Sequence, residues 1–262
     1  MPGTTAEIGV FGGSGFYSFL DDTEPVPVDT PYGKPAGPPV VGTVAGRRVA
    51  FLPRHGADHR FPPHRIPYRA NVWAMRELGV TQILSPCAAG SLRHDVAPGD
   101  FVVVDQLVDR TSGRAQTYYD DRPVHLAFAD PYCSAGRAAA VLVGRGQGIT
   151  VHDTGTMVVV EGPRFSTRAE SQWYAANGWS VINMTGYPEA ILARELELCY
   201  TSIALITDYD AGIEGSGVTQ DEVFRVFADN NARLRELLFA LIPALPTERS
   251  CACATALAAT EL

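Results

Sequence analysis

Short apolar runs alternate along the chain with segments that repeat apolar residues at helical spacing. The runs predict strands at 7–11, 40–45, 48–52, 82–85, 101–105, 156–160, 181–184 and 200–207. The periodic segments predict helices at 68–78, 134–143, 167–177, 189–196 and 221–241. Strands that alternate with helices favour an α/β fold, here a single domain with a mixed central β-sheet flanked by helices.

Local signals mark several boundaries of these elements. Residues 45–47, Ala-Gly-Arg, separate two apolar strands and are typical of a hairpin turn. Gly79 should end the first helix, and the Thr-x-x-Glu patterns at 167–170 and 219–222 are capping boxes that should open two others. The polar stretch 111–130 predicts a long loop, which in a compact domain is usually functional.

Two prolines mark the end of the predicted domain. Pro243 and Pro246 should stop the last helix, so the domain is expected to span residues 1–246. Residues 247–262 are rich in Ala and Thr, and we expect them to form a disordered tail.

The composition narrows the class of protein. With 262 residues, 46% of them hydrophobic, the chain can bury a full core, and disorder, collagen and coiled coil are excluded. No run of about 18 apolar residues predicts a membrane helix. The first residues lack the basic and apolar regions of a secretion signal, so we expect a cytoplasmic protein.

Charge and lysine content exclude further classes. Twenty-one basic and 29 acidic residues give a net charge of −8, which disfavours nucleic acid and anionic membranes as partners. Lys34 is the only lysine, and because Pro35 follows it, a P-loop is impossible. A turn-like surrounding sequence also disfavours a Schiff base at Lys34. Any anionic ligand must therefore be met by a local positive site.

The five cysteines are an odd, scattered set that indicates reduced thiols: Cys87, Cys133, Cys199, Cys251 and Cys253. Cys251 and Cys253 could bind a metal, but no second Cys or His pair stands nearby in the sequence. Since zinc normally needs four ligands, we assign the pair a structural or tail role and expect no metal site.

A glycine-rich turn follows the first strand at residues 9–16, Gly-Val-Phe-Gly-Gly-Ser-Gly-Phe. A nicotinamide-dependent reductase would need a helix next and a second strand that ends in an acidic residue about 20 positions on, and neither pattern is present. The Tyr-x-x-x-Lys pair of that class is also impossible, because Thr30 stands four residues before Lys34. Free backbone N–H groups and the Ser14 hydroxyl could hold phosphate, while a plain tight turn remains open.

Arg54 and His55 follow a predicted strand and could bind an anion, the guanidinium bidentately and the imidazole by donating one more hydrogen bond. The segment 55–64 also holds three histidines and Asp58, but its glycine and prolines indicate a loop, which disfavours a zinc site. Solvated loop histidines remain an alternative.

Polar or small residues follow two more strands. The segment 85–92, Ser-Pro-Cys-Ala-Ala-Gly-Ser-Leu, would let a ligand approach the backbone closely. Cys87 could be a nucleophile, but no His is fixed beside it, so a packing role is favoured. Asp208 and Asp210 stand at i and i+2, where extended side chains point the same way. In a pocket one of them could act as an acid, and at an exposed turn both would be solvated.

Taken in order, seven segments resemble the 5′-methylthioadenosine phosphorylase branch of the trimeric purine nucleoside phosphorylases. They are GVFGGSGF, LPRHGADH, CAAGSL, PGDFVVVDQLVDRT, EGPRFSTRAES, INMTGYPEA and ITDYDAG, and they span about residues 7–225. The resemblance implies phosphorolysis of 5′-methylthioadenosine to adenine and 5-methylthioribose 1-phosphate. Inorganic phosphate would be a co-substrate, with no metal or organic cofactor, and the chain would form a homotrimer.

The resemblance also implies a set of site residues. Phosphate would contact Ser14, Arg54, His55, Cys87, Ala88 and Thr185. The nucleoside would contact Phe165, Ser166, Met184, Asp208, Tyr209, Asp210 and Gln220, and His125 would reach a neighbouring subunit's 5′ pocket. Asp208 would be catalytic as the acid that protonates the leaving purine, help that is typically worth about 10²–10⁴ in rate.

The same comparison bears on which purine leaves. The two acids and Ser166 stand where the 6-oxopurine branch carries Asn and Glu, which favours an exocyclic amine and hence adenine. Cys87 replaces a frequent Thr, and Gln220 replaces an apolar residue of the 5′ pocket. The motif Asn-Met-Thr-Gly at residues 183–186 also occurs in branches of the family that prefer methylthioinosine. A 6-oxopurine nucleoside or methylthioinosine phosphorylase is therefore the alternative.

Overall fold

Strands pair into one mixed, 11-stranded β-sheet in the computed structural model, which describes residues 5–214 and 218–258. They are β1 (Ile8–Gly12), β2 (Glu24–Pro25), β3 (Val40–Val44), β4 (Arg47–Pro53), β5 (Gln82–Ser91), β6 (Phe101–Val103), β7 (Gln106–Arg110), β8 (Val151–His152), β9 (Thr156–Val160), β10 (Val181–Asn183) and β11 (Cys199–Tyr209). The order across the sheet is β2-β3-β4-β1-β5-β10-β9-β7, while β11 pairs with β5 and β6, and β6 with β8. The mixed sheet of the predicted α/β fold is confirmed.

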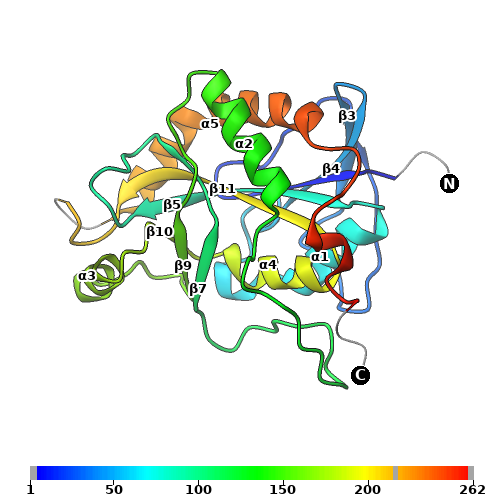
Figure 1. Cartoon of the computed structure of the whole chain (residues 1–262), viewed down its shortest axis with the longest axis horizontal. Coiled ribbons are helices and arrows are strands. Elements are labelled where there is room, and N and C mark those ends of the chain that lie inside the picture. The colour runs from blue at the N-terminus through cyan, green and yellow to red at the C-terminus, as the bar shows by residue number, and fades with distance from the viewer. Residues whose placement is uncertain (1–4, 215–217, 259–262) are drawn as a thin grey trace.

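Helices cover both faces of this sheet. They are α1 (Tyr68–Glu77), α2 (Ser134–Gly146), α3 (Arg168–Ala176), α4 (Gly186–Glu195) and α5 (Gln220–Ala244). Figure 1 shows α2 and α5 on one side of the sheet and α1 and α4 on the other. Within the described residues, no helix is both long and apolar enough to cross a membrane.

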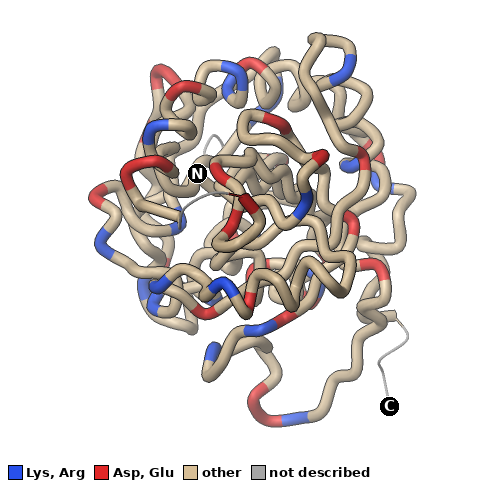
Figure 2. Tube along the Cα trace, turned by 90° about the vertical axis from the view of Figure 1, so that its left-hand side faces the viewer, with Lys and Arg blue, Asp and Glu red and all other residues tan. Residues whose placement is uncertain are grey.

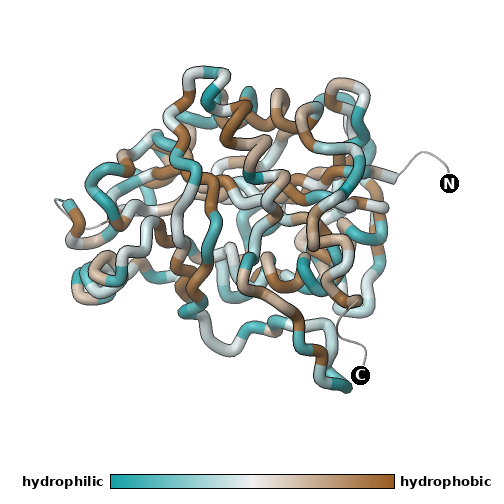
Figure 3. The backbone as a smooth tube through the Cα atoms, viewed as in Figure 1, coloured by the Kyte–Doolittle hydropathy of each residue, from teal (hydrophilic) through white to brown (hydrophobic). Residues whose placement is uncertain are grey.

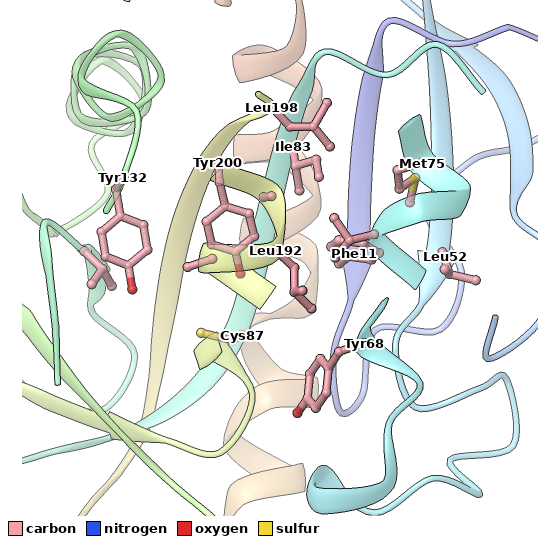
Figure 4. Packing of buried hydrophobic residues seen from close by; sticks show 14 of the residues in the cluster. Phe11, Leu52, Tyr68, Met75, Ile83, Cys87, Tyr132, Leu192, Leu198 and Tyr200 are labelled. Atoms are coloured by element: carbon pink, nitrogen blue, oxygen red, sulfur yellow. The ribbon is translucent and has the colours of Figure 1, made fainter. Parts of the chain in front are cut away.

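Two buried apolar clusters fill the space between the sheet and the helices. The first lies on the side of α1 and α4 and includes Phe11, Met75, Leu192 and Tyr200 (Figure 4). The second lies on the side of α2 and α5 and includes Phe16, Phe19, Phe51, Phe227, Leu234 and Leu238. Each such buried side chain stabilises the fold by roughly 1.5–3 kcal/mol. Figure 3 shows the hydrophobic stretches concentrated in the interior strands and in α2 and α5, as this packing requires.

The central parallel strands end at one edge of the sheet. β1 pairs in parallel with β4 and β5, and β5 pairs in parallel with β11. Their carboxyl ends therefore gather the glycine-rich turn, Arg54 and the Asp208–Asp210 pair. The strand β5 continues to Ser91, beyond the predicted end at residue 85, because its later residues pair with β11 and its last two with β10.

Several predicted boundaries are confirmed, whereas the predicted stop at Pro243 is wrong. Strands β3 and β4 form the antiparallel hairpin. Thr167 caps α3 in a full capping box, and the Thr219 side chain accepts the N–H of Glu222 at the start of α5. Pro243 does not stop α5, which continues to Ala244. A proline in the last turn removes one hydrogen bond near an end that would fray, so the helix tolerates it.

Residues 247–258 lie against the domain, which differs from the disordered tail expected for 247–262. Arg249 Nη1 donates to the carbonyl oxygen of Glu197 at 2.6 Å, and the N–H of Leu257 donates to Glu197 Oε1 at 3.1 Å. A short 3₁₀ helix, Ala252–Thr255, lies between these anchors. Figure 1 shows this segment in red, running from the end of α5 towards α4. Residues 259–262 lie outside the described part of the chain.

Candidate active site

A cavity of about 320 Å³ lies at the carboxyl ends of the parallel strands and reaches the start of α5. Its volume is typical of a site for a small organic ligand. It brings together twelve of the fourteen residues predicted for the site: Ser14, Arg54, His55, Cys87, Ala88, Phe165, Ser166, Met184, Thr185, Asp208, Asp210 and Gln220. The other two, Tyr209 and His125, do not line it.

Arg54 is held at the base of the cavity by a buried ion pair. Its Nε and Nη2 donate to the carboxylate of Glu189 at 2.9 and 3.2 Å, and both side chains are 1% exposed. Nη2 also donates to Ser85 Oγ and Nη1 to the Pro86 carbonyl, which leaves one Nη1–H for a ligand among the described residues. Burial acts to lower the pKa of Arg54, but the nearby Glu189 carboxylate acts to raise it, and the net pKa lies above its usual value. The guanidinium therefore stays charged.

These contacts change the predicted role of Arg54. Bidentate binding of an anion would need two free N–H groups. Within the described part of the chain Arg54 has only one, because its other four N–H groups donate to Glu189, Ser85 and Pro86. Gly13 lies against the free end, since a Cβ on it would stand 2.8 Å from Arg54 Nη1. The glycine therefore allows the turn after β1 to close on the guanidinium without covering it.

His55 presents a neutral ring to the cavity. Its Nδ1 lies 2.8 Å from the carbonyl oxygen of Phe61, and because a carbonyl only accepts, Nδ1 carries the proton. Burial lowers the pKa of His55 to about 3. The remaining nitrogen, Nε2, is then a hydrogen-bond acceptor rather than the donor expected from the sequence. The His59 ring stacks on the His55 ring, with 4.4 Å between the ring centroids.

Asp208 and Asp210 enter the cavity through an irregularity in β11. The pairing with β5 shifts by one residue between Ile206 and Asp208, which is a β-bulge at Thr207. Simple alternation would send the side chains of Thr207 and Asp208 to opposite faces, yet both line the cavity. The Thr207 hydroxyl donates to Asp208 Oδ1 at 2.7 Å. The Tyr209 hydroxyl instead donates to the His94 carbonyl, away from the cavity.

The two carboxyl groups have different surroundings. Burial raises the pKa of Asp208 to about 6, with Asp210 and Glu222 adding to the rise and Thr207 opposing it. Burial also raises the pKa of Asp210, but hydrogen bonds from Ser171, the Ala211 N–H and Ser166 oppose it. The Ser171 hydroxyl donates to Asp210 Oδ2 in a short hydrogen bond. Asp208 is therefore suited to carry a proton, and Asp210 is held as an acceptor.

On the side of the cavity that is predicted to bind phosphate, the sequence interpretation missed a polar residue. Asn183, at the end of β10, accepts the N–H groups of Thr185 and Gly186 through Oδ1, both at 3.3 Å. Its Nδ2 lies 3.5 Å from Thr185 Oγ1, so Asn183 orients the hydroxyl predicted to bind phosphate. Burial raises the pKa of the Cys87 thiol, which disfavours the nucleophilic role and agrees with packing.

Other residues of the site also lacked a local signal. The positioning residues Glu189, Ser85, Tyr200 and Ser171 are buried polar groups whose partners come from distant segments. The further lining residues are Gly13, His59, Pro62, Pro63, Ala89, Gly90, Val160, Pro163, Ile182, Asn183, Thr207, Val223 and Phe224. A buried Glu in an apolar helix needs a cationic partner, and that rule could have singled out Glu189 had its burial been known.

Comparison with known proteins gives the family. A family model described as the phosphorylase superfamily matches residues 7–243. The chain belongs to the phosphorylase superfamily. A Streptomyces coelicolor relative named purine nucleoside phosphorylase is 60% identical, over 96% of this chain and 94% of its own. A Mycolicibacterium smegmatis relative named S-methyl-5′-thioadenosine phosphorylase is 58% identical, over 93% of each chain.

The solved structures agree with this membership of the phosphorylase superfamily. The structure of methylthioadenosine phosphorylase from Schistosoma mansoni in complex with adenine matches with a TM-score of 0.88 and 37% identity, over 91% of each chain. The predicted resemblance, the fold and the class of enzyme, a glycosyltransferase of the nucleoside phosphorylase type, are confirmed. These two relatives carry different names, so the names alone do not identify the purine base that this enzyme releases. The chemistry of the cavity must decide it.

Proposed function

We propose that the enzyme catalyses phosphorolysis of 5′-methylthioadenosine. An oxygen of inorganic phosphate forms a bond to C1′ while the C1′–N9 bond breaks and its electron pair moves to the purine. Asp208 gives a proton to N7, so the products are adenine and 5-methylthioribose 1-phosphate. The observation that carries the proposal is one cavity with the Arg54 guanidinium and two hydroxyl groups at one end and a buried carboxyl group, its pKa raised to about 6, at the other.

The phosphate end has the groups that this nucleophile needs. The hydroxyls of Ser14 and Thr185 and the free Nη1–H of Arg54 supply donors. The neutral His55 ring supplies an acceptor, which suits the single proton of HPO₄²⁻. A dianion held here stabilises the positive charge that develops on the sugar as the glycosidic bond breaks.

The purine end has the groups that adenine needs. The adenine amino group is a donor, and Asp210, held by Ser171, offers carboxylate oxygens to it. Protonated Asp208 relieves the negative charge that develops on the leaving base. Phe165 lies at the cavity with 37% of its surface exposed, where it can cover the base.

A 6-oxopurine substrate is the second candidate, and the Streptomyces coelicolor relative named purine nucleoside phosphorylase supports it. A 6-oxopurine presents an O6 acceptor, which an ionised carboxylate repels but a protonated one can bind. Asp208, with its pKa raised to about 6, could serve in that form. The choice between the two purines therefore depends on the protonation of the two acids.

A substrate panel tests the proposal. The purified full chain is assayed with 5′-methylthioadenosine, adenosine, 5′-methylthioinosine and inosine, each with and without phosphate. We expect the largest kcat/KM for 5′-methylthioadenosine and no base release without phosphate. Preference for the inosine pair would overturn the adenine assignment. Full-rate cleavage without phosphate would identify a hydrolase.

The proposal extends to the assembly. The exposed His125 lies on the long segment between β7 and α2 and outside the cavity of its own subunit. We propose a cytoplasmic homotrimer in which this segment brings His125 to the 5′ pocket of a neighbouring subunit. Phosphate and the nucleoside would then be the small-molecule partners, with no resident cofactor.

A further inference from the structure

Four cysteines from three distant parts of the chain meet at one place. Cys133 immediately precedes α2, Cys199 begins β11, and Cys251 and Cys253 belong to the segment after α5. Their four sulfur atoms all lie within 4.8 Å of one another. This is the one such group of potential metal ligands among the described residues. The sequence interpretation missed it, because Cys133 and Cys199 are separated from the Cys251–Cys253 pair by long stretches of chain.

Two of the distances between the sulfur atoms are close to the edge length of a tetrahedral metal site. Zinc binds thiolate sulfur at about 2.3 Å, so the edges of a tetrahedral site are about 3.8 Å long. The Sγ atom of Cys251 lies 3.7 Å from that of Cys133 and 3.3 Å from that of Cys199. A central ion would thus need shifts of only a few tenths of an ångström in these pairs.

The surroundings hold the four sulfur atoms in place. Cys133, Cys199 and Cys253 are buried, with at most 4% of their surfaces exposed. Gly136 lets the start of α2 pack directly on β11, since a Cβ there would stand 2.1 Å from Thr201 Oγ1. The positive end of the 13-residue helix α2 favours a thiolate at Cys133.

The cluster is separate from the active site. Cys199 and Asp208 stand at opposite ends of β11, and nine residues of strand at about 3.3 Å each place them roughly 30 Å apart. None of the four cysteines lines the cavity, whereas the fifth, Cys87, does. The proposed reaction uses no residue of the cluster.

We propose that Cys133, Cys199, Cys251 and Cys253 form a structural zinc site. Binding of Zn²⁺ by the four thiols releases four protons and leaves a closed tetrathiolate complex with a charge of −2. The site joins the C-terminal segment to the starts of α2 and β11. It explains why this Ala/Thr-rich segment carries two cysteines that face the core.

Metal analysis of the full-length, untagged protein tests the site. Protein produced in zinc-containing medium under reducing conditions is expected to hold about one zinc per chain, and X-ray absorption should give four sulfur neighbours at about 2.3 Å. The double variant Cys251→Ser, Cys253→Ser should fall to less than about a tenth of that content. Cys87→Ser, which removes a buried thiol elsewhere, is the matched control and should keep its zinc.

The double variant could lose zinc simply because it misfolds, so a second measurement uses the wild-type chain alone. Removing zinc from the wild-type chain with a chelator should lower its Tm, and added zinc should restore it. Four results would overturn the site: wild-type protein without zinc, zinc retained by the double variant, iron in its place, or a mass lower by two hydrogens per pair of cysteines. The last would identify disulfides instead.

Discussion

Asp208 combines burial with an open hydrogen-bonding face, and this makes its proton the centre of the proposed chemistry. An Asn at this position keeps the shape but cannot give a proton to N7. We expect Asp208→Asn to lower kcat/KM for 5′-methylthioadenosine by about 10²–10⁴. Because the Asn amide can donate to O6, the loss on 5′-methylthioinosine should be smaller. Steady-state assays of both substrates check this, and equal losses would show that the side chain does not distinguish the bases.

The raised pKa of Asp208 also predicts how stability depends on pH. The pKa is about 6 in the folded chain against a usual 3.8, so between these values the folded state holds more protons than the unfolded one. Stability contributed by Asp208 is therefore full below pH 3.8 and is lost as pH rises towards 6. The loss amounts to about 3 kcal/mol.

Urea unfolding of the wild type and Asp208→Asn from pH 4 to 7.5 measures this effect. Relative to the wild type, the free energy of unfolding of the variant should increase as pH rises from about 4 to about 6. Above that range the difference between the two proteins should stay constant. Asp21→Asn controls for the loss of one carboxyl group, since the Asp21 side chain is 86% exposed. A wild-type-minus-variant difference that stays constant with pH would contradict the raised pKa.

At the scale of single residues, the sequence could identify the side chains that line the cavity but not the groups that position them. The pattern at Asp208 and Asp210 predicts two acids on one face, and both line the cavity. The bulge that adds Thr207 depends on pairing with β5, and the partner of Arg54 depends on how α4 packs. Both are tertiary features, without a local pattern in the sequence.

At the scale of elements, the Arg54–Glu189 pair joins β4 to α4 inside the fold. Removing one charge of a buried pair leaves the other unpaired, which typically costs about 3–5 kcal/mol. We expect Glu189→Gln to lower the free energy of unfolding by this amount and to raise KM for phosphate as Arg54 shifts. The exposed pair Arg145–Asp153 gives the matched control, and Asp153→Asn should change stability by less than about 1 kcal/mol.

Chemical denaturation and phosphate titrations of both variants measure these effects. A Glu189→Gln enzyme as stable as Asp153→Asn would show that the pair does not hold α4 to the sheet. An unchanged KM for phosphate in a destabilised enzyme would limit Glu189 to a structural role.

Elements with strong local signals were predicted well, and elements defined by their neighbours were not. The hairpin β3–β4 and the capping box of α3 depend on residues within a few positions of one another. The short edge strands β2 and β8 and the second half of β5 exist because another strand lies beside them. Pro243 stayed inside α5 because the last turn loses little by it.

At the scale of the whole molecule, the charge of −8 is spread rather than concentrated. Figure 2 shows acidic and basic residues interspersed along the chain. Attraction of phosphate therefore depends on the cavity and not on the overall field. The net charge led us to expect a local positive site for any anionic ligand, and the buried Arg54 at the cavity is the candidate for it.

The proposed trimer predicts that one subunit completes the substrate site of the next. Light scattering should give about three times the chain mass of 28.1 kDa. His125→Ala should raise KM for 5′-methylthioadenosine about tenfold, the loss of about 1.4 kcal/mol of binding, and leave KM for phosphate unchanged. His94→Ala is the control, since that ring is 71% exposed and lies outside the cavity. A monomer with full activity, or equal effects of both variants, would mean that each chain builds its 5′ pocket alone.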